Sequence, residues 1–262
     1  MTLARRTLLA LLAASALASP LAAQTPEEIK AKGSITVGML VDFPPFGVMN
    51  AENKPDGYDA DVAKLLAKDL GVELVILPVT GPNRIPYLLS GQVDALVASL
   101  GITPERAERV AFSDPYAGIA IGVYGDVGVD LSAPEKLSGH AIGVTRASTQ
   151  DTAVTAVAPA DARIQRFDDD ASAVQALLAG QVEAIGVSNI ISSQIEAMAP
   201  GRFEVKFPLS QQVQGIAVRP GQDAFLAEIN AVVEKAKADG SLNAIHEKWL
   251  GTPLPDFVAA SN

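Results

Sequence analysis

The chain reads Leu88-Leu89-Ser90-Gly91-Gln92-Val93-Asp94-Ala95 before its midpoint, and the pattern returns as Leu177-Leu178-Ala179-Gly180-Gln181-Val182-Glu183-Ala184. Each copy ends a helical apolar stretch, turns at a glycine and enters a strand-like run. A strand-like segment precedes each copy, Ile35-Thr36-Val37-Gly38 before the first and Ala141-Ile142-Gly143-Val144 before the second. Two unrelated units with a common helix-to-strand turn would also give this echo, but two similar α/β lobes explain it better. The offset of 177 − 88 = 89 residues is not a solenoid period.

Short β-branched runs alternate with amphipathic helical stretches along the rest of the chain, which is the pattern of an α/β protein. The sequence predicts strands at 34–38, 72–79, 93–98 and 215–221 and helices around 62–70, 85–91, 224–238 and 242–250. An extended apolar run at 119–124 is followed by the turn-rich stretch Gly125-Asp126-Val127-Gly128. If this run and 215–221 both cross between the lobes, the cleft can open and close by hinge bending.

The composition excludes several classes of function. The 262 residues carry 30 acidic and 20 basic side chains, a formal net charge of −10, and no basic run that would favour nucleic acid as a partner. Cysteine is absent, so disulfides, thiol nucleophiles and Cys-ligated metals are excluded. His140 and His246 are the only histidines, which leaves little material for a metal centre or a catalytic triad. We therefore expect no metal and no cofactor.

The N-terminus has the pattern of a secretory signal peptide. Arg5 and Arg6 precede the apolar stretch Leu8–Ala18, and Leu21-Ala22-Ala23 offers a small-residue cleavage site. The apolar stretch is shorter than the ~20 residues that span a bilayer. A buried N-terminal helix is the alternative. Removal of residues 1–23 takes away two arginines and no acids, so the mature chain has a net charge of 18 − 30 = −12.

The segment Ser99–Arg106 leaves a predicted strand and enters a helix. Thr103 is a good N-cap and Pro104 suits the first helical position, which places Arg106 in the first turn. The helix dipole disfavours a cation there, so Arg106 needs an anionic partner. That partner is either Glu108 or Asp114 in a surface pair, or a ligand carboxylate bound by the guanidinium fork.

The second half has a counterpart in Thr145-Arg146-Ala147-Ser148-Thr149-Gln150, which again follows a strand and precedes a helix. Hydroxyls and free N–H groups at a helix start can bind an anion, or they can simply cap the helix. Equivalent positions in two similar lobes would face each other across a cleft. Arg84, at a third helix start, is either another ligand-binding cation or a solvated surface arginine. Phe43, in a proline-stiffened loop, is a candidate stacking wall.

Six stretches then resemble periplasmic solute-binding proteins of the polar amino acid ABC transporter type, extracellular solute-binding family 3. They are 57–63, 90–95, 102–107, 112–116, 215–218 and 239–251, in order over nearly the whole mature chain. The resemblance implies two lobes, each a mixed, mostly parallel sheet flanked by helices, joined by two hinge strands. Lobe 1 would comprise 24–122 and 215–262, and lobe 2 would comprise 123–214. A ligand closed between them would be delivered to a membrane permease.

The resemblance also implies roles for single residues. Phe43 falls at the aromatic that stacks on the ligand, Arg106 at the arginine that binds the α-carboxylate, and Ser99 at a polar contact. Asn83-Arg84-Ile85-Pro86 is similar to the glutamate and aspartate binders of the family, in which the arginine reaches the side-chain carboxylate. With the second-lobe contacts, the predicted ligand-binding residues are Phe43, Gly81, Arg84, Ser99, Gly101, Arg106, Thr145, Ser148, Asp170 and Ser188.

The chain departs from the family pattern at several of these positions. Leu40 stands where an acidic residue is frequent, Gly101 where Thr or Ser is, and Ser188 where an Asp binds the α-ammonium. Gly81 replaces an aromatic or leucine wall and leaves room beside Arg84. Within 168–170, Asp170 is the best candidate for a replacement ammonium partner, whereas its two neighbours fit a solvated charge run at a helix start.

We therefore expect a monomeric, non-enzymatic periplasmic receptor for a small carboxylate-bearing solute, an acidic or polar amino acid. One alternative is an enzyme similar to periplasmic cyclohexadienyl or arogenate dehydratases, which needs a general acid in the cleft. Another is a stand-alone ligand sensor.

The signal-peptide assignment predicts the N-terminus of the exported protein. When the full chain is expressed in an exporting host, intact-mass analysis of the purified protein should give a chain that begins near Gln24. Recovery of Met1 on the exported protein would contradict the assignment.

Overall fold

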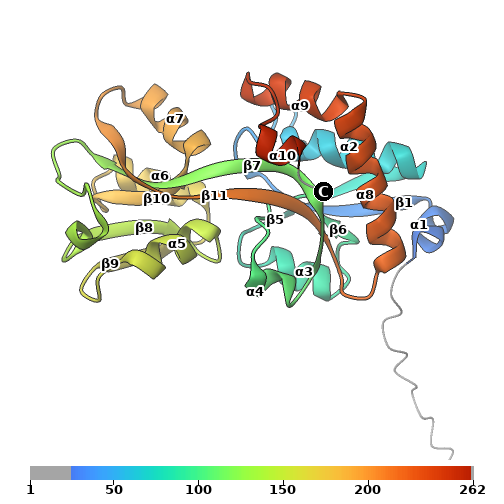
Figure 1. Cartoon of the computed structure of the whole chain (residues 1–262), viewed down its shortest axis with the longest axis horizontal. Helices are drawn as coiled ribbons and strands as arrows, with labels where there is room; N and C mark the ends of the chain where they lie inside the picture. Colours follow the sequence, from blue (N-terminus) through green and yellow to red (C-terminus); the bar gives the residue numbers. More distant parts are fainter. Residues whose placement is uncertain (1–24, 261–262) are drawn as a thin grey trace, which may run out of the picture.

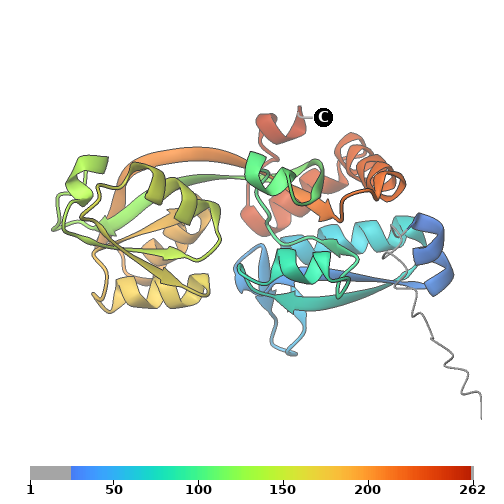
Figure 2. The ribbon, with the colours of Figure 1, turned by 90° about the horizontal axis from the view of Figure 1, so that it is seen from below.

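Two long strands connect two α/β lobes in the computed structural model, which describes residues 25–260 (Figure 1). They are β7 (Ala111–Asp126) and β11 (Phe203–Val218), paired antiparallel along their length. A second view shows them as a narrow bridge between the lobes (Figure 2). The predicted two-lobed fold with two hinge strands is confirmed. The two predicted lobe boundaries, at 122/123 and 214/215, fall inside β7 and β11 and remain a prediction. The predicted signal peptide at 1–23 lies outside the described residues.

One eight-stranded sheet runs through both lobes in the order β5-β1-β6-β11-β7-β10-β8-β9. Three parallel strands belong to each lobe: β1 (Ser34–Leu40), β5 (Glu73–Val79) and β6 (Ala95–Leu96) to the first, and β8 (Ala141–Thr145), β9 (Arg163–Phe167) and β10 (Ala184–Ser188) to the second. β11 pairs antiparallel with β6, and β7 pairs antiparallel with β10. The predicted mixed, mostly parallel sheets are therefore confirmed. Ligands of open α/β sheets bind beyond the carboxyl ends of parallel strands, so these ends mark where to look for a site.

Helices cover the sheet in each lobe (Figure 1). The first lobe has α1 (Pro26–Lys32), α2 (Tyr58–Leu70), α3 (Arg84–Leu89), α4 (Pro104–Ala107), α8 (Asp223–Ala238), α9 (Ser241–Leu250) and α10 (Asp256–Ala259). The second has α5 (Thr149–Val157), α6 (Asp170–Leu178), α7 (Asn189–Met198) and the 3-10 turn η1 (Pro134–Leu137). A small sheet joins β2 (Asp42–Phe43), β3 (Gly47–Met49) and β4 (Pro55–Asp56). Each helix among residues 25–260 is too short or too polar to cross a membrane.

The sequence echo corresponds to the same structural unit in each lobe. α3 leads through Gly91 into β6, and α6 leads through Gly180 into β10. Both glycines have left-handed backbones, with φ of 76° and 70°, which a side chain would strain. The strand predicted at 93–98 is buried, but only two of its residues form β6. An apolar run in the sequence indicates burial, whereas a strand also requires hydrogen bonds to neighbouring strands. The predicted break at 125–128 begins later, since β7 continues to Asp126.

A buried polar network connects the start of α2 with the end of the β6 segment. Asp59 is fully buried and accepts hydrogen bonds from Ser99 Oγ and Tyr116 Oη, both at 2.8 Å. Tyr116 Oη in turn accepts a bond from Ser99 N at 3.1 Å. Ser99 has a left-handed backbone with φ of 46°, which is uncommon for a residue with a side chain. Asp59 and Tyr116 therefore hold Ser99 in a conformation that it would not adopt alone.

Burial raises the pKa of Asp59 from its ordinary value of 3.8 to about 7. The folded protein therefore binds this proton more tightly than the unfolded chain does, and the resulting stabilisation is lost as the pH rises from about 4 to about 7. In urea titrations across this range, the unfolding free energy of the wild type should fall relative to that of Asp59→Asn, by up to about 1.4 kcal/mol per pH unit. A difference between the two proteins that stays constant with pH would show that Asp59 does not titrate in this way.

Candidate ligand-binding site

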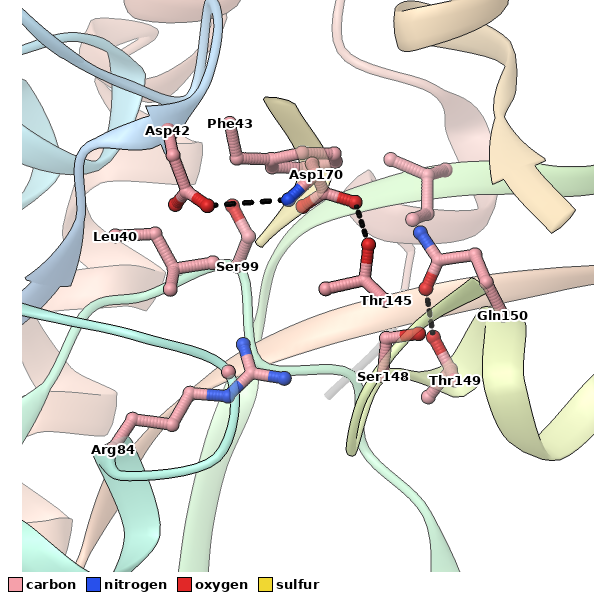
Figure 3. A pocket seen from close by; sticks show the side chains of 12 residues that line it. Leu40, Asp42, Phe43, Arg84, Ser99, Thr145, Ser148, Thr149, Gln150 and Asp170 are labelled. Carbon is pink, nitrogen blue, oxygen red and sulfur yellow. Dashed lines mark hydrogen bonds between the residues drawn. The ribbon is translucent and has the colours of Figure 1, made fainter. Parts of the chain in front are cut away.

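A cavity lined by residues of both lobes lies beyond the carboxyl ends of the parallel strands (Figure 3). The first lobe and β7 line it with Leu40, Asp42, Phe43, Gly81, Arg84, Ser99 and Ile119, and the second lobe lines it with Thr145, Ser148, Thr149, Gln150 and Asp170. Seven of the ten predicted residues are thus brought together: Phe43, Gly81, Arg84, Ser99, Thr145, Ser148 and Asp170. Their contact with a ligand remains a prediction.

Two arginines lie on one side of this region. Arg84 is only 4% exposed, and its Nη1 donates to Ala98 O at 2.8 Å. Of the two alternatives for Arg84, the solvated surface arginine is therefore wrong. Arg106 lines an adjoining cavity that shares Gly81, Arg84 and Thr149 with the first. Its Nη1 donates to Gly101 O and its Nη2 to Ala147 O of the opposite lobe, both at 2.9 Å.

The helix cap predicted for Arg106 is present, because Thr103 Oγ1 accepts a bond from Arg106 N at 3.2 Å. Among the described residues, the guanidinium forms no ion pair with Glu108 or Asp114, so the surface-pair alternative is wrong. Burial and, to a smaller extent, the positive charge of Arg84 lower the pKa of Arg106 to about 9. Burial also lowers the pKa of Arg84. Two neighbouring guanidiniums without a bonded carboxylate form a region that attracts an anion.

Two carboxylates lie on another side of the cavity. Asp170 Oδ1 accepts a hydrogen bond from Thr145 Oγ1 at 2.6 Å, and burial raises the pKa of Asp170 to about 6. Asp42 Oδ2 accepts a bond from Asp170 N at 3.3 Å, across the two lobes (Figure 3). Burial raises the pKa of Asp42 as well. The two other aspartates of the run behave as a helix start: Asp169 caps α6, and Asp168 forms an exposed pair with Arg146.

The remaining predicted residues lie outside the first cavity. Ser188 is fully buried and caps α7, accepting a bond from Ile191 N at 3.3 Å. Gly101 faces the side chain of Gln212, whose amide would lie 2.2–2.4 Å from a Cβ at this position. The room expected at Gly81 is also limited, because Arg146 O would lie 2.9 Å from a Cβ there. The second lobe therefore fills the space that a larger wall residue would need.

Sequence reasoning missed Asp42 and Ile119 as lining residues, and it named Thr149 and Gln150 only within the candidate segment 145–150. Asp42 is next to Phe43, just beyond β1, so the position of the aromatic wall was the signal that could have found it. Phe43 itself is buried and stacks on Phe46, with ring centroids 5.4 Å apart. Thr149 Oγ1 and Gln212 Oε1 lie 2.6 Å apart, which connects α5 with β11.

The assembled site has the chemistry of a receptor for a small dipolar solute. Guanidinium groups, carboxylates, hydroxyls and an aromatic wall converge between two lobes. A further contact joins the lobes, since Gln194 Nε2 donates to Pro44 O at 2.7 Å. Residues 25–260 contain no group of three or more His, Asp or Glu side chains placed to hold a metal ion.

Comparison with known proteins places this geometry in a family. Residues 35–252 match the bacterial extracellular solute-binding proteins, family 3. The ABC transporter glutamine-binding protein GlnH of Bacillus subtilis (strain 168) is 34% identical over 230 residues, covering 85% of this chain and 83% of that protein.

Two solved structures have the same fold. The solute receptor for L-cysteine of Neisseria gonorrhoeae has a TM-score of 0.81 at 33% identity, covering 87% of this chain and 94% of that one. The ancestral amino acid-binding protein AncCDT-1, a precursor of cyclohexadienyl dehydratase, has a TM-score of 0.77 at 29% identity, covering 86% and 98%. The chain belongs to the bacterial extracellular solute-binding proteins, family 3.

Proposed function

We propose that this protein is the periplasmic substrate-binding component of an ABC transporter and that it captures an acidic or polar amino acid. The observation that carries the proposal is a pair of guanidiniums beside a cavity between two hinged lobes. Arg84 is buried, Arg106 is half-buried, and neither forms an ion pair with a carboxylate among the described residues. Relatives whose names specify glutamine and L-cysteine support an amino acid as the ligand class. The predicted signal peptide supports export.

In this proposal the ligand carboxylate lies against Arg84 and Arg106, where it supplies the anion that these groups lack. Bidentate binding to guanidinium is both strong and directional. Hydroxyls at the start of α5, from Ser148 and Thr149, face the same region from the second lobe. A ligand that contacts both lobes favours the closed form, and the membrane permease then recognises that form.

A thermal-shift screen tests the proposal and identifies the ligand. A solute that binds only the folded state at about 100 times its Kd stabilises the protein by about 2.7 kcal/mol. The panel contains acidic, amide, sulfur-containing and basic amino acids together with their keto-acid analogues and dicarboxylates. Stabilisation by at least one amino acid supports the proposal, and none at millimolar concentration contradicts it.

An enzyme of the dehydratase type is the second candidate, because AncCDT-1 is described as a precursor of such an enzyme and Asp170 offers an acid with a raised pKa in the cavity. Its test is incubation of the purified protein with prephenate while phenylpyruvate is monitored. The proposal of a binding protein requires that no phenylpyruvate forms above the uncatalysed rate.

Removal of Arg106 should weaken binding. Because Arg106→Ala deletes a desolvated partner of the ligand carboxylate, the amino acid found in the screen should bind about 2–5 kcal/mol more weakly in isothermal titration calorimetry. Arg146→Ala is the matched control, since Arg146 is half-exposed and paired with Asp168. Unchanged affinity in a folded Arg106→Ala protein would remove this assignment.

Removal of Arg84 tests the specificity. If Arg84 reaches a second carboxylate on the ligand, Arg84→Ala should weaken dicarboxylic amino acids more than their monocarboxylic amides, such as glutamate compared with glutamine. The measurement is the ratio of the two dissociation constants in the wild type and in the variant. Equal losses for both ligands would reject the side-chain role.

A further inference from the structure

Asp42 and Asp170 come from opposite lobes and meet at the cavity. Asp42 follows β1 in the first lobe, whereas Asp170 begins α6 in the second. Their only bonded link is from the backbone N–H of Asp170 to Asp42 Oδ2 at 3.3 Å. Figure 3 shows the dashed hydrogen bond from Asp42 to the backbone nitrogen of Asp170, and Thr145 bonded to the Asp170 carboxylate on its other side. When the lobes come together, electrostatic repulsion between the two negative carboxylates raises the free energy of the closed form.

The hydrogen bonding of this pair is incomplete. Asp170 Oδ1 accepts a bond from Thr145 Oγ1 at 2.6 Å, but Asp42 Oδ1 is shielded from solvent and has no partner. A buried carboxylate oxygen without a donor is costly. The missing element is therefore a group that donates several hydrogen bonds and carries positive charge.

The charges around the pair do not supply that group. Arg84 is the cation that acts on both carboxylates, but its described hydrogen bond goes to Ala98 O and it forms no ion pair with either. Asp169, at the start of α6, adds further negative charge to both. The negative charge of Asp59, which accepts a hydrogen bond from Ser99 Oγ, also interacts with Arg84 and partly offsets the lowering of its pKa by burial. The cavity thus separates guanidiniums near α3 and α4 from carboxylates near β2 and α6.

We propose that Asp42 and Asp170 form one ammonium-binding subsite, with a carboxylate from each lobe, and that the ligand's ammonium group draws the lobes together by bridging them. The inference rests on the proposed function and deepens it. An ammonium group has three N–H donors and one positive charge, which matches both the vacant Asp42 oxygen and the excess negative charge. The ligand class is then an amino acid, with its ammonium at this pair and its carboxylate toward the arginines. A keto acid or hydroxy acid of the same shape lacks the bridging charge.

The test compares ligands that differ at one group. Isothermal titration calorimetry uses two pairs, L-glutamate with 2-oxoglutarate and L-glutamine with 2-oxoglutaramate, on the wild type and on Asp42→Asn, Asp170→Asn and Asp168→Asn. The wild type should prefer the amino acid of at least one pair by about 100-fold or more. Either cavity variant should reduce that preference by about 10-fold or more, whereas Asp168→Asn should keep it, because Asp168 is exposed and paired with Arg146.

A double variant tests whether the two carboxylates act on the same group. If one ammonium bridges both, Asp42→Asn combined with Asp170→Asn should lose much less than the sum of the two single losses. Additive losses would show two independent contacts and would overturn the shared subsite. Retention of the full preference in both folded single variants would overturn it as well.

The outcomes separate this inference from the proposed function. If neither member of any pair binds and the thermal-shift screen finds no amino acid, the proposed function fails. If amino acids bind but their keto analogues bind equally well, the receptor function stands and the ammonium subsite is wrong. Thermal unfolding of each variant shows that it is folded. If loss of the Thr145–Asp170 hydrogen bond unfolds Asp170→Asn, the Asp42→Asn variant still tests the subsite, because it leaves that bond intact.

Discussion

The antiparallel ladder between β7 and β11 is the constraint on which the rest of the structure depends. It pairs Phe203 with Asp126 in the second lobe and Val218 with Ala111 in the first, so the two chain crossings stay next to each other over their whole length. Hinge closure concentrates the backbone change in a few such residues. The ladder also makes one sheet of the two lobes, with three parallel strands on each side of the crossing pair. Loops at the carboxyl ends of those strands consequently supply both walls of the cavity.

Electrostatics then explains why such a cavity needs a ligand. Charged side chains lose hydration between the lobes, and only complementary charge offsets that loss. Arg106 already bridges the lobes through Ala147 O, and Asp42 reaches Asp170 N, so partial contacts exist without a solute. These contacts leave the guanidiniums without an anion and one Asp42 oxygen without a donor. In the proposed function, recognition and closure are coupled, because the groups proposed to bind the solute come from both lobes.

Local patterns in the sequence predicted much of this architecture. The echo at 88–95 and 177–184 identified the two lobes because each copy needs a left-handed glycine between a helix and a strand. Thr103 and Ser148 were recognisable as helix starts, since short polar side chains satisfy the free N–H groups there. Phe43 and Arg84 reach the cavity as expected.

Features that depend on contacts distant in sequence were not predictable in the same way. The full length of β7 and β11 follows from their pairing with each other, not from their own composition. Ser188 falls at a strand end like the other candidates, but its hydroxyl caps α7 and it does not line the cavity. Asp42 was missed because a carboxylate after a strand looks the same in sequence whether it faces solvent or a second lobe. Only the approach of α6 makes it part of a site.

The most direct test of this account is a crystal structure of the protein with the amino acid that stabilises it most. We expect closed lobes with the ligand between them, its carboxylate within hydrogen-bonding distance of Arg84 or Arg106. A ligand bound on one lobe alone, or away from both arginines, would contradict the account.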